Sequence, residues 1–304
     1  MRNEASAAHL PLTVAIPTYQ RDSVLVDTLR SLLALQARAA EILVLDQTAE
    51  HEPSTTQQLQ EFADAGDIRW IRLAEPSIPA AMNQGLLLAS EPLVLFLDDD
   101  IVPEPGLIAA HVNAHSTHPE GIIAAGRVIQ PWEEGISVPD GDPFRFASLK
   151  PRWIGEFMGG NFSVPKKMAI GLGGFDENFV KVAYRFEAEF AHRYRAGGKQ
   201  VLFVPDACIH HLKVAAGGTR TFGDHLSTWR PDHAVGAYYY AFKTGSWDVF
   251  LIRPLRSIAT RYHLRNPWRM PSTLVAELRG MAWATRLFVH GPRRLNGAAS
   301  EEVQ

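Results

Sequence analysis

The sequence predicts an α/β fold in which helices cover both faces of a Rossmann-like, mostly parallel sheet, followed by a helical, arginine-rich C-terminal tail. Two observations predict the sheet: short apolar runs alternate with segments of helical apolar spacing, and several runs end directly in polar residues. A third observation predicts the tail, because nine arginines and one acidic residue, Glu277, lie between positions 253 and 294.

The first half of the chain supports the sheet element by element. Five apolar runs have the length of a buried strand, and they lie at 12–17, 41–46, 67–73, 92–97 and 121–129. The segments between them carry apolar residues three or four positions apart, which predicts helices at 21–36, 53–65, 79–90 and 105–116. This alternation favours a parallel sheet.

The second half is less regular and begins with a proline-rich stretch that we expect to be mostly loop. The ordered elements expected after it are a strand at 159–164, a helix at 187–196 and a strand at 199–205. The pair Gly197–Gly198 is a helix stop signal. From residue 234 onward we expect helices.

Composition excludes several classes of protein. The 304 residues are 46% hydrophobic and 21% charged, which is ordinary for a globular protein. The net charge of -3 gives no bulk attraction for a phosphate backbone, so we expect no nucleic-acid partner. A single cysteine, Cys208, excludes an intrachain disulfide framework and fits a reducing compartment. We find no secretory signal and no apolar run long enough to span a bilayer, and we expect a cytoplasmic protein.

Three adjacent carboxylates, Asp98 to Asp100, follow the fourth predicted strand. Their mutual repulsion makes full ionisation costly, and a divalent cation removes that cost. Mg²⁺ or Mn²⁺ prefers oxygen ligands and commonly takes further ligands from substrate phosphates. The cluster therefore predicts a metal ion and a diphosphate partner. The alternative is a solvated acidic turn at the start of the next helix.

Two other predicted strands also end in polar residues. Ligands of open parallel sheets bind at the carboxyl ends of the strands. We therefore expect Thr18, Arg21 and Asp46 to line one crevice with the aspartates, where they could hold a nucleoside. Alternatively, Thr18 caps the following helix and Asp46 caps a turn.

The chain resembles family 2 glycosyltransferases of the GT-A fold over roughly residues 12 to 212. Six segments carry the resemblance in the family's order: VAIPTYQR, ILVLDQT, PAAMNQGL, LFLDDDI, GGNFSV and GGFDENF. The resemblance implies inverting transfer of a sugar from a nucleotide-diphosphate donor, usually UDP-linked, with Mg²⁺ or Mn²⁺ as cofactor.

The resemblance also implies roles for single residues. Those matching the donor site are Pro17, Thr18, Arg21, Asp46, Asn83, Asp98 and Asp99, of which Asp46 would pair with the base edge and Asn83 would lie near the ribose and diphosphate. Those beside the donor sugar and acceptor are Gly159, Gly160 and Asn161. Those matching metal ligands are Asp98, Asp100 and, after the strand at 199–205, His211, although His210 or His211 could equally be a structural histidine.

The catalytic base has two candidates. Glu187 stands where the family's catalytic aspartate stands, but Phe186 replaces the acid that normally precedes it. Glu189 is the rival, and it could instead pair with Arg193 four residues on. Inversion requires one carboxylate to accept the proton of the acceptor hydroxyl. Further on, Gly217–Gly218 with Arg220 could form a lid whose arginine meets the leaving diphosphate.

The sequence as a whole predicts a metal-dependent glycosyltransferase that acts on a glycan or lipid-linked acceptor, and we expect a role in cell-surface polysaccharide synthesis. We expect a catalytic domain at 1–233, with a nucleotide-binding half at 12–130 and an acceptor half at 131–233, and an extension at 234–304. One rival is a sugar-phosphate nucleotidyltransferase, which should carry a glycine-rich loop after the first strand, where this chain has Thr18-Tyr19-Gln20-Arg21. The other rival is a binding module without activity.

The arginine-rich tail has two interpretations. Aromatic and aliphatic residues are interleaved with its arginines, which suits an amphipathic segment on an anionic membrane surface. The protein would then be peripheral on the inner face of the cytoplasmic membrane. Alternatively, the tail is a solvated basic helix packed on the catalytic domain.

Overall fold

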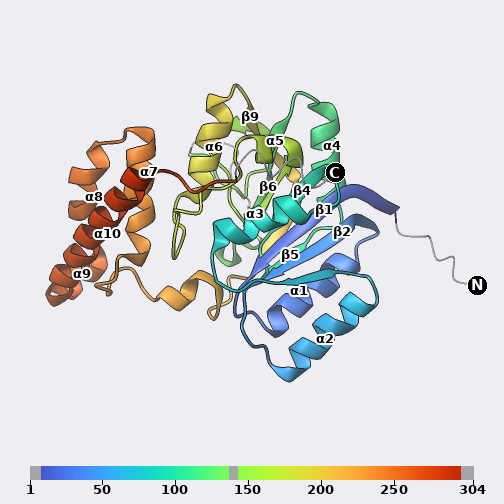
Figure 1. Ribbon diagram of the computed structural model, residues 1–304, viewed down its shortest axis with the longest axis horizontal. Coiled ribbons are helices and arrows are strands. Elements are labelled where there is room, and N and C mark those ends of the chain that lie inside the picture. The colour runs from blue at the N-terminus through green and yellow to red at the C-terminus, as the bar shows by residue number, and fades with distance from the viewer. Residues whose placement is uncertain (1–7, 137–142, 296–304) are drawn as a thin grey trace, which may run out of the picture.

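The structure is a computed structural model that describes residues 8–136 and 143–295, apart from the side chains of Ala8, Thr219 and Arg220. A twisted sheet lies between two layers of helices, and a group of helices stands beside this body (Figure 1). The predicted α/β class and the helical C-terminal part are therefore confirmed.

The sheet has the strand order β3-β2-β1-β4-β8-β6-β9-β5, with β7 also paired to β9. Its parallel half consists of β1 (Ala8–Thr18), β2 (Ala37–Asp46), β3 (Arg69–Arg72) and β4 (Leu93–Leu97). Beyond β4, the strand β8 (Asn161–Pro165) runs antiparallel to both β4 and β6 (Ile122–Ile129). The strand β9 (Gln200–His211) is parallel to β6 and antiparallel to the short β5 (Ile101–Pro103) and β7 (Arg152–Ile154).

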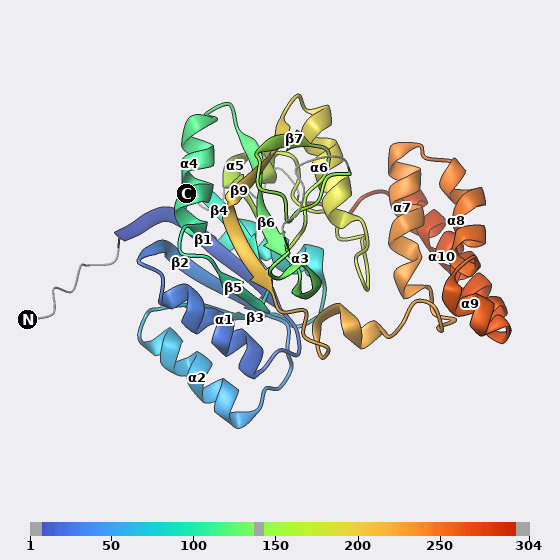
Figure 2. The ribbon, with the colours of Figure 1, turned by 180° about the vertical axis from the view of Figure 1, so that it is seen from behind.

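Two hydrophobic cores cover the two faces of the sheet. Alternate residues of each strand enter different cores, so that Leu95 packs on one face and Phe96 on the other. The Leu95 face is covered by α1 (Ser23–Leu33), α2 (Pro53–Asp64) and α4 (Leu107–Thr117). The Phe96 face is covered by α3 (Ile78–Leu88), α5 (Lys166–Gly171) and α6 (Phe186–Ala196) (Figure 2).

The largest departure from the predicted elements is the length of β9. It was expected to end at residue 205 but continues to His211. A register shift between Gly126 and Arg127 of β6 lets β9 bulge and resume pairing at Cys208. Its last three residues then pair with β5, a three-residue strand too short to stand out in the sequence.

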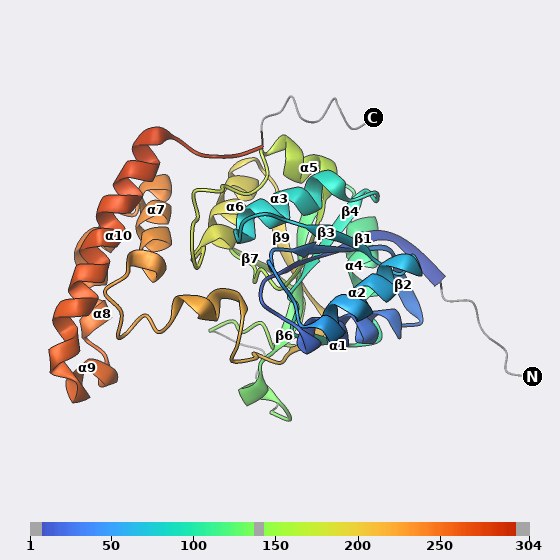
Figure 3. The same ribbon diagram turned by 60° about the horizontal axis from the view of Figure 1, so that its bottom comes forward.

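The helices of the C-terminal part are α7 (Val235–Thr244), α8 (Asp248–Ile258), α9 (Arg261–Arg265) and α10 (Met270–His290). The long α10 lies along α7, and residues 291–295 then return to the sheet-containing body as an extended strap (Figure 3). Among the described residues, no helix is both long and apolar enough to cross a membrane. The domain boundary at 233/234 stays a prediction.

Candidate active site

The end of β4 places three carboxylates at one edge of the sheet. The backbone N–H of Asp98 donates to the carbonyl of Gly160, which ties the start of the acidic run to β8. The strand β5 begins directly after Asp100, and its first residue, Ile101, lies opposite His211 of β9. The pairing of β5 with β9 therefore brings a histidine more than a hundred positions away to the aspartates.

The three predicted metal ligands come together. The Nε2 atom of His211 lies 3.1 Å from an oxygen of Asp100 and 3.8 Å from an oxygen of Asp98. One ligand atom from each of the three residues falls within 4.8 Å of the others. Asp100 is buried, whereas the side chain of Asp98 is 47% exposed and leaves this site open on one side. Two carboxylates and one imidazole are a donor set that fits Mg²⁺ or Mn²⁺.

The two neighbouring histidines point in opposite directions, as successive side chains of a strand do. His210 Nδ1 and Nε2 lie 2.6 Å and 2.7 Å from oxygens of Glu134 and Glu104, and these carboxylates raise its pKa against the effect of burial. The Nδ1 atom of His211 instead lies 3.2 Å from the Gln130 side-chain oxygen. Of the two candidates, only His211 faces the aspartates.

Arg21 forms ion pairs with two of the three aspartates. Its Nε lies 3.3 Å from Asp99 and its Nη2 lies 3.5 Å from Asp100. Its Nη1 donates to the carbonyls of Val214 and Ala216, so the same guanidinium also fixes the segment after β9. Burial raises the pKa of Asp99 to about 7 despite the arginine. Burial also tends to raise the pKa of Asp100, but the hydrogen bond and charge of His211 lower it overall.

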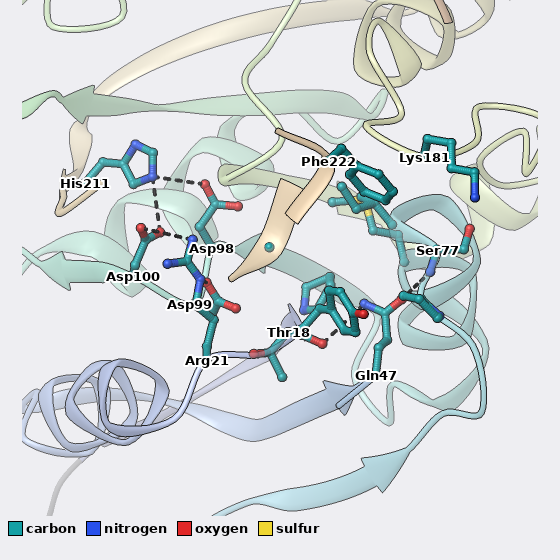
Figure 4. Close-up of a pocket in the computed structure, with 16 residues that line it drawn as sticks. Thr18, Arg21, Gln47, Ser77, Asp98, Asp99, Asp100, Lys181, His211 and Phe222 are labelled. Atoms are coloured by element: carbon teal, nitrogen blue, oxygen red, sulfur yellow. Dashed lines mark hydrogen bonds and ion pairs between the residues drawn. The ribbon is translucent and has the colours of Figure 1, made fainter. Parts of the chain in front are cut away.

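A cavity of about 200 Å³ opens beside these carboxylates. Figure 4 shows the aspartates and His211 at one end, Gln47 and Ser77 at the other, and Lys181 with Phe222 on a third side. Of the predicted donor residues, those that line this cavity are Pro17, Thr18, Arg21, Asp98 and Asp99. We call it the first cavity.

Asp46 does not line the first cavity, which corrects the prediction that it faces the crevice. Its carboxylate is fully buried behind the end of β2. One oxygen accepts from the backbone N–H of Thr48, and the other lies 2.9 Å from His51 Nε2 and accepts from the indole of Trp70. The neighbouring Gln47 takes the place at the cavity, where its side chain accepts from the Ser77 N–H.

Asn83 is also directed away from the first cavity. This buried side chain donates to the carbonyl of Phe175 and to Glu177, and it accepts from the N–H of Phe175. It thereby fastens the turn at 173–179 to α3. The residue predicted near the ribose is structural, because its amide is occupied by the backbone of Phe175 and the side chain of Glu177 in a distant loop.

A second cavity of about 420 Å³ adjoins the first. Both are lined by Ile78, Met82 and Asp98, so the two cavities meet at the exposed aspartate. Glu187, from the first turn of α6, lines the second cavity. Burial, reinforced by the charge of Asp98, raises the pKa of Glu187 to about 7. A carboxylate with this pKa can accept a proton near neutral pH.

Gly159 and Gly160 allow the close approach of these acids. A Cβ atom on Gly160 would lie 2.0 Å from the Asp98 carboxylate, and one on Gly159 would lie 3.2 Å from the Glu187 carboxylate. Asn161 is different, which corrects its predicted place beside the acceptor. Its buried amide donates to the carbonyls of Arg127 and Ala207, on the two strands of the β6–β9 register shift.

Glu189 lies outside both cavities. It is buried on the opposite side of α6 and pairs at 2.8 Å with Arg193 and with Lys243 of α7. Arg294 of the strap lies 3.3 Å from the same oxygen. The structure thus separates the two candidate bases: Glu187 lines a cavity, and Glu189 holds a cluster of cations. Phe186, which replaces the family's first acid, is buried against Phe175.

The segment after β9 closes over one side of the first cavity. The N–H of Gly218 donates to the carbonyl of Tyr19, and Gly217 adopts a left-handed conformation with φ of 76°. A Cβ atom on Gly217 would lie 2.2 Å from the carbonyl of Gln20, so only glycine fits there. The side chain of Arg220, predicted to meet the diphosphate, lies outside the described part of the chain.

Two polar residues of the first cavity, Ser77 and Lys181, were not predicted from the sequence, whereas Gln47 lies at a strand end that was expected to face the crevice. Gln47 directly follows Asp46, so the strand end was predicted correctly and the residue that faces the cavity differs by one position. Ser77 also caps α3 by accepting from Ala80 N–H, a signal that suggests only a helix start. Lys181 lies in a loop that carries no recognisable motif, with φ of 62°. Only the surrounding fold places it at the cavity.

Residues 13–175 match the model of the family described as Glycosyl transferase family 2. Validoxylamine A glucosyltransferase of Streptomyces hygroscopicus subsp. limoneus is 27% identical over 225 residues, covering 60% of this chain and 49% of that protein. The chain therefore spans about half the length of the curated relatives it matches.

Solved structures show the same fold. S. aureus TarS 1-349 in complex with UDP-GlcNAc matches with a TM-score of 0.57 and 14% identity, covering 77% of this chain and 66% of that one. The mannosyltransferase PcManGT from Pyrobaculum calidifontis, in complex with GDP-Man and Mn²⁺, matches with a TM-score of 0.55 and 18% identity, covering 92% and 79%. At these identities the likeness concerns the fold alone.

Proposed function

Because the chain belongs to glycosyl transferase family 2, we propose that it transfers a sugar from a nucleotide-diphosphate donor, a UDP-sugar, to a hydroxyl group of a glycan or lipid-linked acceptor, with inversion. One observation carries the proposal. The first cavity, with the candidate metal ligands, meets the second cavity, with Glu187, at the shared residue Asp98. A donor in the first cavity and an acceptor in the second would place the reacting atoms at this junction.

The first cavity suits a nucleotide-diphosphate. Its polar end offers side-chain and backbone groups of Gln47, Thr18 and Ser77 for a nucleoside, while Lys181 supplies a cation for phosphate oxygens. The curated relative is a glucosyltransferase, and structural neighbours hold UDP-GlcNAc or GDP-Man. These names support a nucleotide-sugar donor for this chain.

Asp98, Asp100 and His211 would hold a divalent ion at the diphosphate end of the first cavity. Such an ion, when bound, stabilises the negative charge that develops on the leaving diphosphate. The chain supplies the rest of the arrangement. Gln130 orients the imidazole of His211, and Arg21 holds Asp99 and Asp100 in place.

Glu187 would act as the general base. No described side chain donates a hydrogen bond to its carboxylate, and its raised pKa makes it a stronger base than an exposed glutamate. It would take the proton of the acceptor hydroxyl as that oxygen attacks the anomeric carbon from the face opposite the diphosphate. This direction of attack inverts the configuration.

The test compares Glu187→Gln with Glu189→Gln, two identical changes two residues apart. A panel of nucleotide sugars with Mn²⁺ first identifies the donor by calorimetric binding. We expect Glu187→Gln to keep donor affinity and thermal stability but to lose turnover about 10²- to 10⁴-fold, the usual contribution of a general base. Glu189→Gln should instead lower thermal stability, because it leaves three cations around a neutral amide.

Two outcomes would contradict this proposal. If Glu189→Gln abolishes turnover in a folded protein while Glu187→Gln does not, the base is wrongly assigned. If the protein binds no nucleotide sugar but releases pyrophosphate from a nucleoside triphosphate and a sugar phosphate, it is a nucleotidyltransferase.

A further inference from the structure

The surface of α8, α9 and the turn Pro267–Arg269 differs in charge from the rest of the chain. Asp248, the first residue of α8, is the only acidic residue between 248 and 276, a stretch with five arginines and no lysine in a protein whose net charge is -3. Four of these arginines, at 256, 261, 265 and 269, have no carboxylate within ion-pair distance among the described residues. Only Arg253 is paired, at 3.0 Å with Glu277.

Large apolar side chains are exposed on the same segment. Leu251 is 77% exposed, Leu255 66%, Leu264 77% and Trp268 68%. Not one residue of α8 is buried, although the helix has an apolar side. Isolated exposed leucines are common in proteins, but several in one short segment mark an interaction site. Figures 1 and 3 show α8 and α9 at the end of the molecule remote from the sheet.

We propose that this outer surface, which we call the α8–α9 surface, binds the surface of an anionic phospholipid bilayer. Leucine and tryptophan side chains would enter the boundary between headgroups and acyl chains, while arginines contact lipid phosphates. The guanidinium group suits this role because it binds phosphate with two parallel hydrogen bonds.

Charge complementarity favours lipid over other occupants. A second copy of the chain would oppose the four unpaired arginines with the same four, and like charges in contact repel each other. A nucleic acid would satisfy the arginines but leave Leu251, Leu255 and Leu264 against a charged phosphate backbone. An anionic bilayer offers phosphates and an apolar interior within one surface.

The inner side of α8 reaches the wall of the second cavity. The guanidinium carbon of Arg253 lies 5.8 Å from the ring centre of Tyr184, which lines that cavity. Gly236 of α7 packs directly on the backbone of Tyr184, where a Cβ atom would lie 2.3 Å from its carbonyl oxygen. Docking at the α8–α9 surface would therefore hold this cavity near the membrane. The binding itself does not depend on the proposed reaction.

Vesicle flotation with the purified full chain tests the proposal. We expect it to float with vesicles of phosphatidylglycerol and phosphatidylcholine at about 0.1 M salt, and not with phosphatidylcholine alone. The double variant Arg261→Glu/Arg265→Glu should bind at least about tenfold more weakly, since each basic residue near an anionic surface contributes about fivefold. Leu255→Ser/Leu264→Ser should also lose binding.

Matched variants elsewhere show whether the effect is local. Lys167→Glu/Arg195→Glu makes the same charge change on exposed residues of α5 and α6, and Ile136→Ser/Val289→Ser removes equally exposed apolar groups. Both should bind vesicles like the unchanged protein. The proposal is overturned if the unchanged protein ignores anionic vesicles, if the matched variants lose binding equally, or if the surface forms a dimer in sedimentation without binding vesicles.

Discussion

At the scale of single residues, the site depends on which polar side chains remain free of protein partners. Asp46 and Asn83 both stand in segments that resemble the family's motifs, yet each is saturated by hydrogen bonds inside the fold. Among the described residues, no side chain donates a hydrogen bond to the carboxylate of Glu187, which receives only a backbone N–H and lies at a cavity. A desolvated carboxylate with few hydrogen-bond donors resists ionisation, and this resistance makes it useful as a base near neutral pH.

The pKa of Glu187 predicts a pH profile. Only the ionised carboxylate accepts a proton, so a pKa raised to about 7 means that activity falls as pH drops through this value. We expect kcat/KM to rise about tenfold per pH unit on the acid side, with a midpoint near 7, and to level off above it. Rate measurements from pH 5 to 9, with donor binding measured in parallel, check this. A midpoint near 4.5 would show that another group, or an unperturbed carboxylate, is the base.

At the scale of elements, the meeting of strand ends builds the site. The antiparallel pairing of β5 with β9 places His211 beside the aspartates. Gly160, directly before β8, leaves room for the Asp98 carboxylate because it has no side chain. The two acids of the first turn of α6 illustrate the same point. Positions 187 and 189 differ by about 200° around a helix, so one enters the cavity and the other faces α7.

A methyl group at Gly160 should disrupt the metal site without unfolding the protein. In Gly160→Ala, the new Cβ would stand 2.0 Å from an Asp98 oxygen and force that carboxylate away from His211. We expect Mn²⁺ affinity to fall at least about tenfold, because second-sphere disturbances typically have this effect. Manganese titration followed by electron paramagnetic resonance measures it without any substrate.

The control for this change is Gly171→Ala, where a Cβ atom would meet no other atom within 4 Å. This variant should bind Mn²⁺ as the unchanged protein does. Equal affinity in Gly160→Ala would show that Asp98 is not a metal ligand.

At the scale of the whole molecule, a buried cluster of charges joins the helical part to the sheet-containing body. Lys243 of α7 contacts Asp176 and Glu189 at 2.7 Å and 2.8 Å. The strap at 291–295 adds Arg294 to the same cluster. The backbone of the strap also forms hydrogen bonds with the turn at 173–178. The helix α6 is therefore attached both to α7 and to the strap.

Removal of the strap should destabilise the whole fold. A chain ending at His290 loses the bonds from Leu295 N–H to Gly173, from Glu177 N–H to Arg293, and from the Asn178 amide to Gly291. At about 1 kcal/mol each, and with Arg294 lost from a buried cluster, we expect a decrease of about 3–5 kcal/mol in the free energy of unfolding. Urea titration monitored by circular dichroism checks this.

A chain ending at Leu295 keeps all these contacts and serves as the reference. If the two chains unfold at the same urea concentration, the strap does not hold α6, and the charge cluster needs no contribution from Arg294.

The sequence by itself determined the order of the longer strands and helices along the chain, the place of the aspartates at a strand end and the family. Each of these follows from local patterns: apolar periodicity, turn residues and short motifs within a few positions of one another. The same patterns could not distinguish Asp46 from Gln47, or Glu187 from Glu189, as the residue at a cavity.

Only the tertiary structure decided those alternatives. The side chains that occupy Asp46 and Glu189 include Trp70 of β3, Lys243 of α7 and Arg294 of the strap, the last of them 105 positions from Glu189. A polar group becomes structural or available for chemistry according to whether such distant partners satisfy it, since an unsatisfied buried group is costly and a satisfied one is inert. Sequence motifs locate a polar residue at a strand end or in a helix, and contacts with residues distant in the sequence decide whether it is structural or available for chemistry.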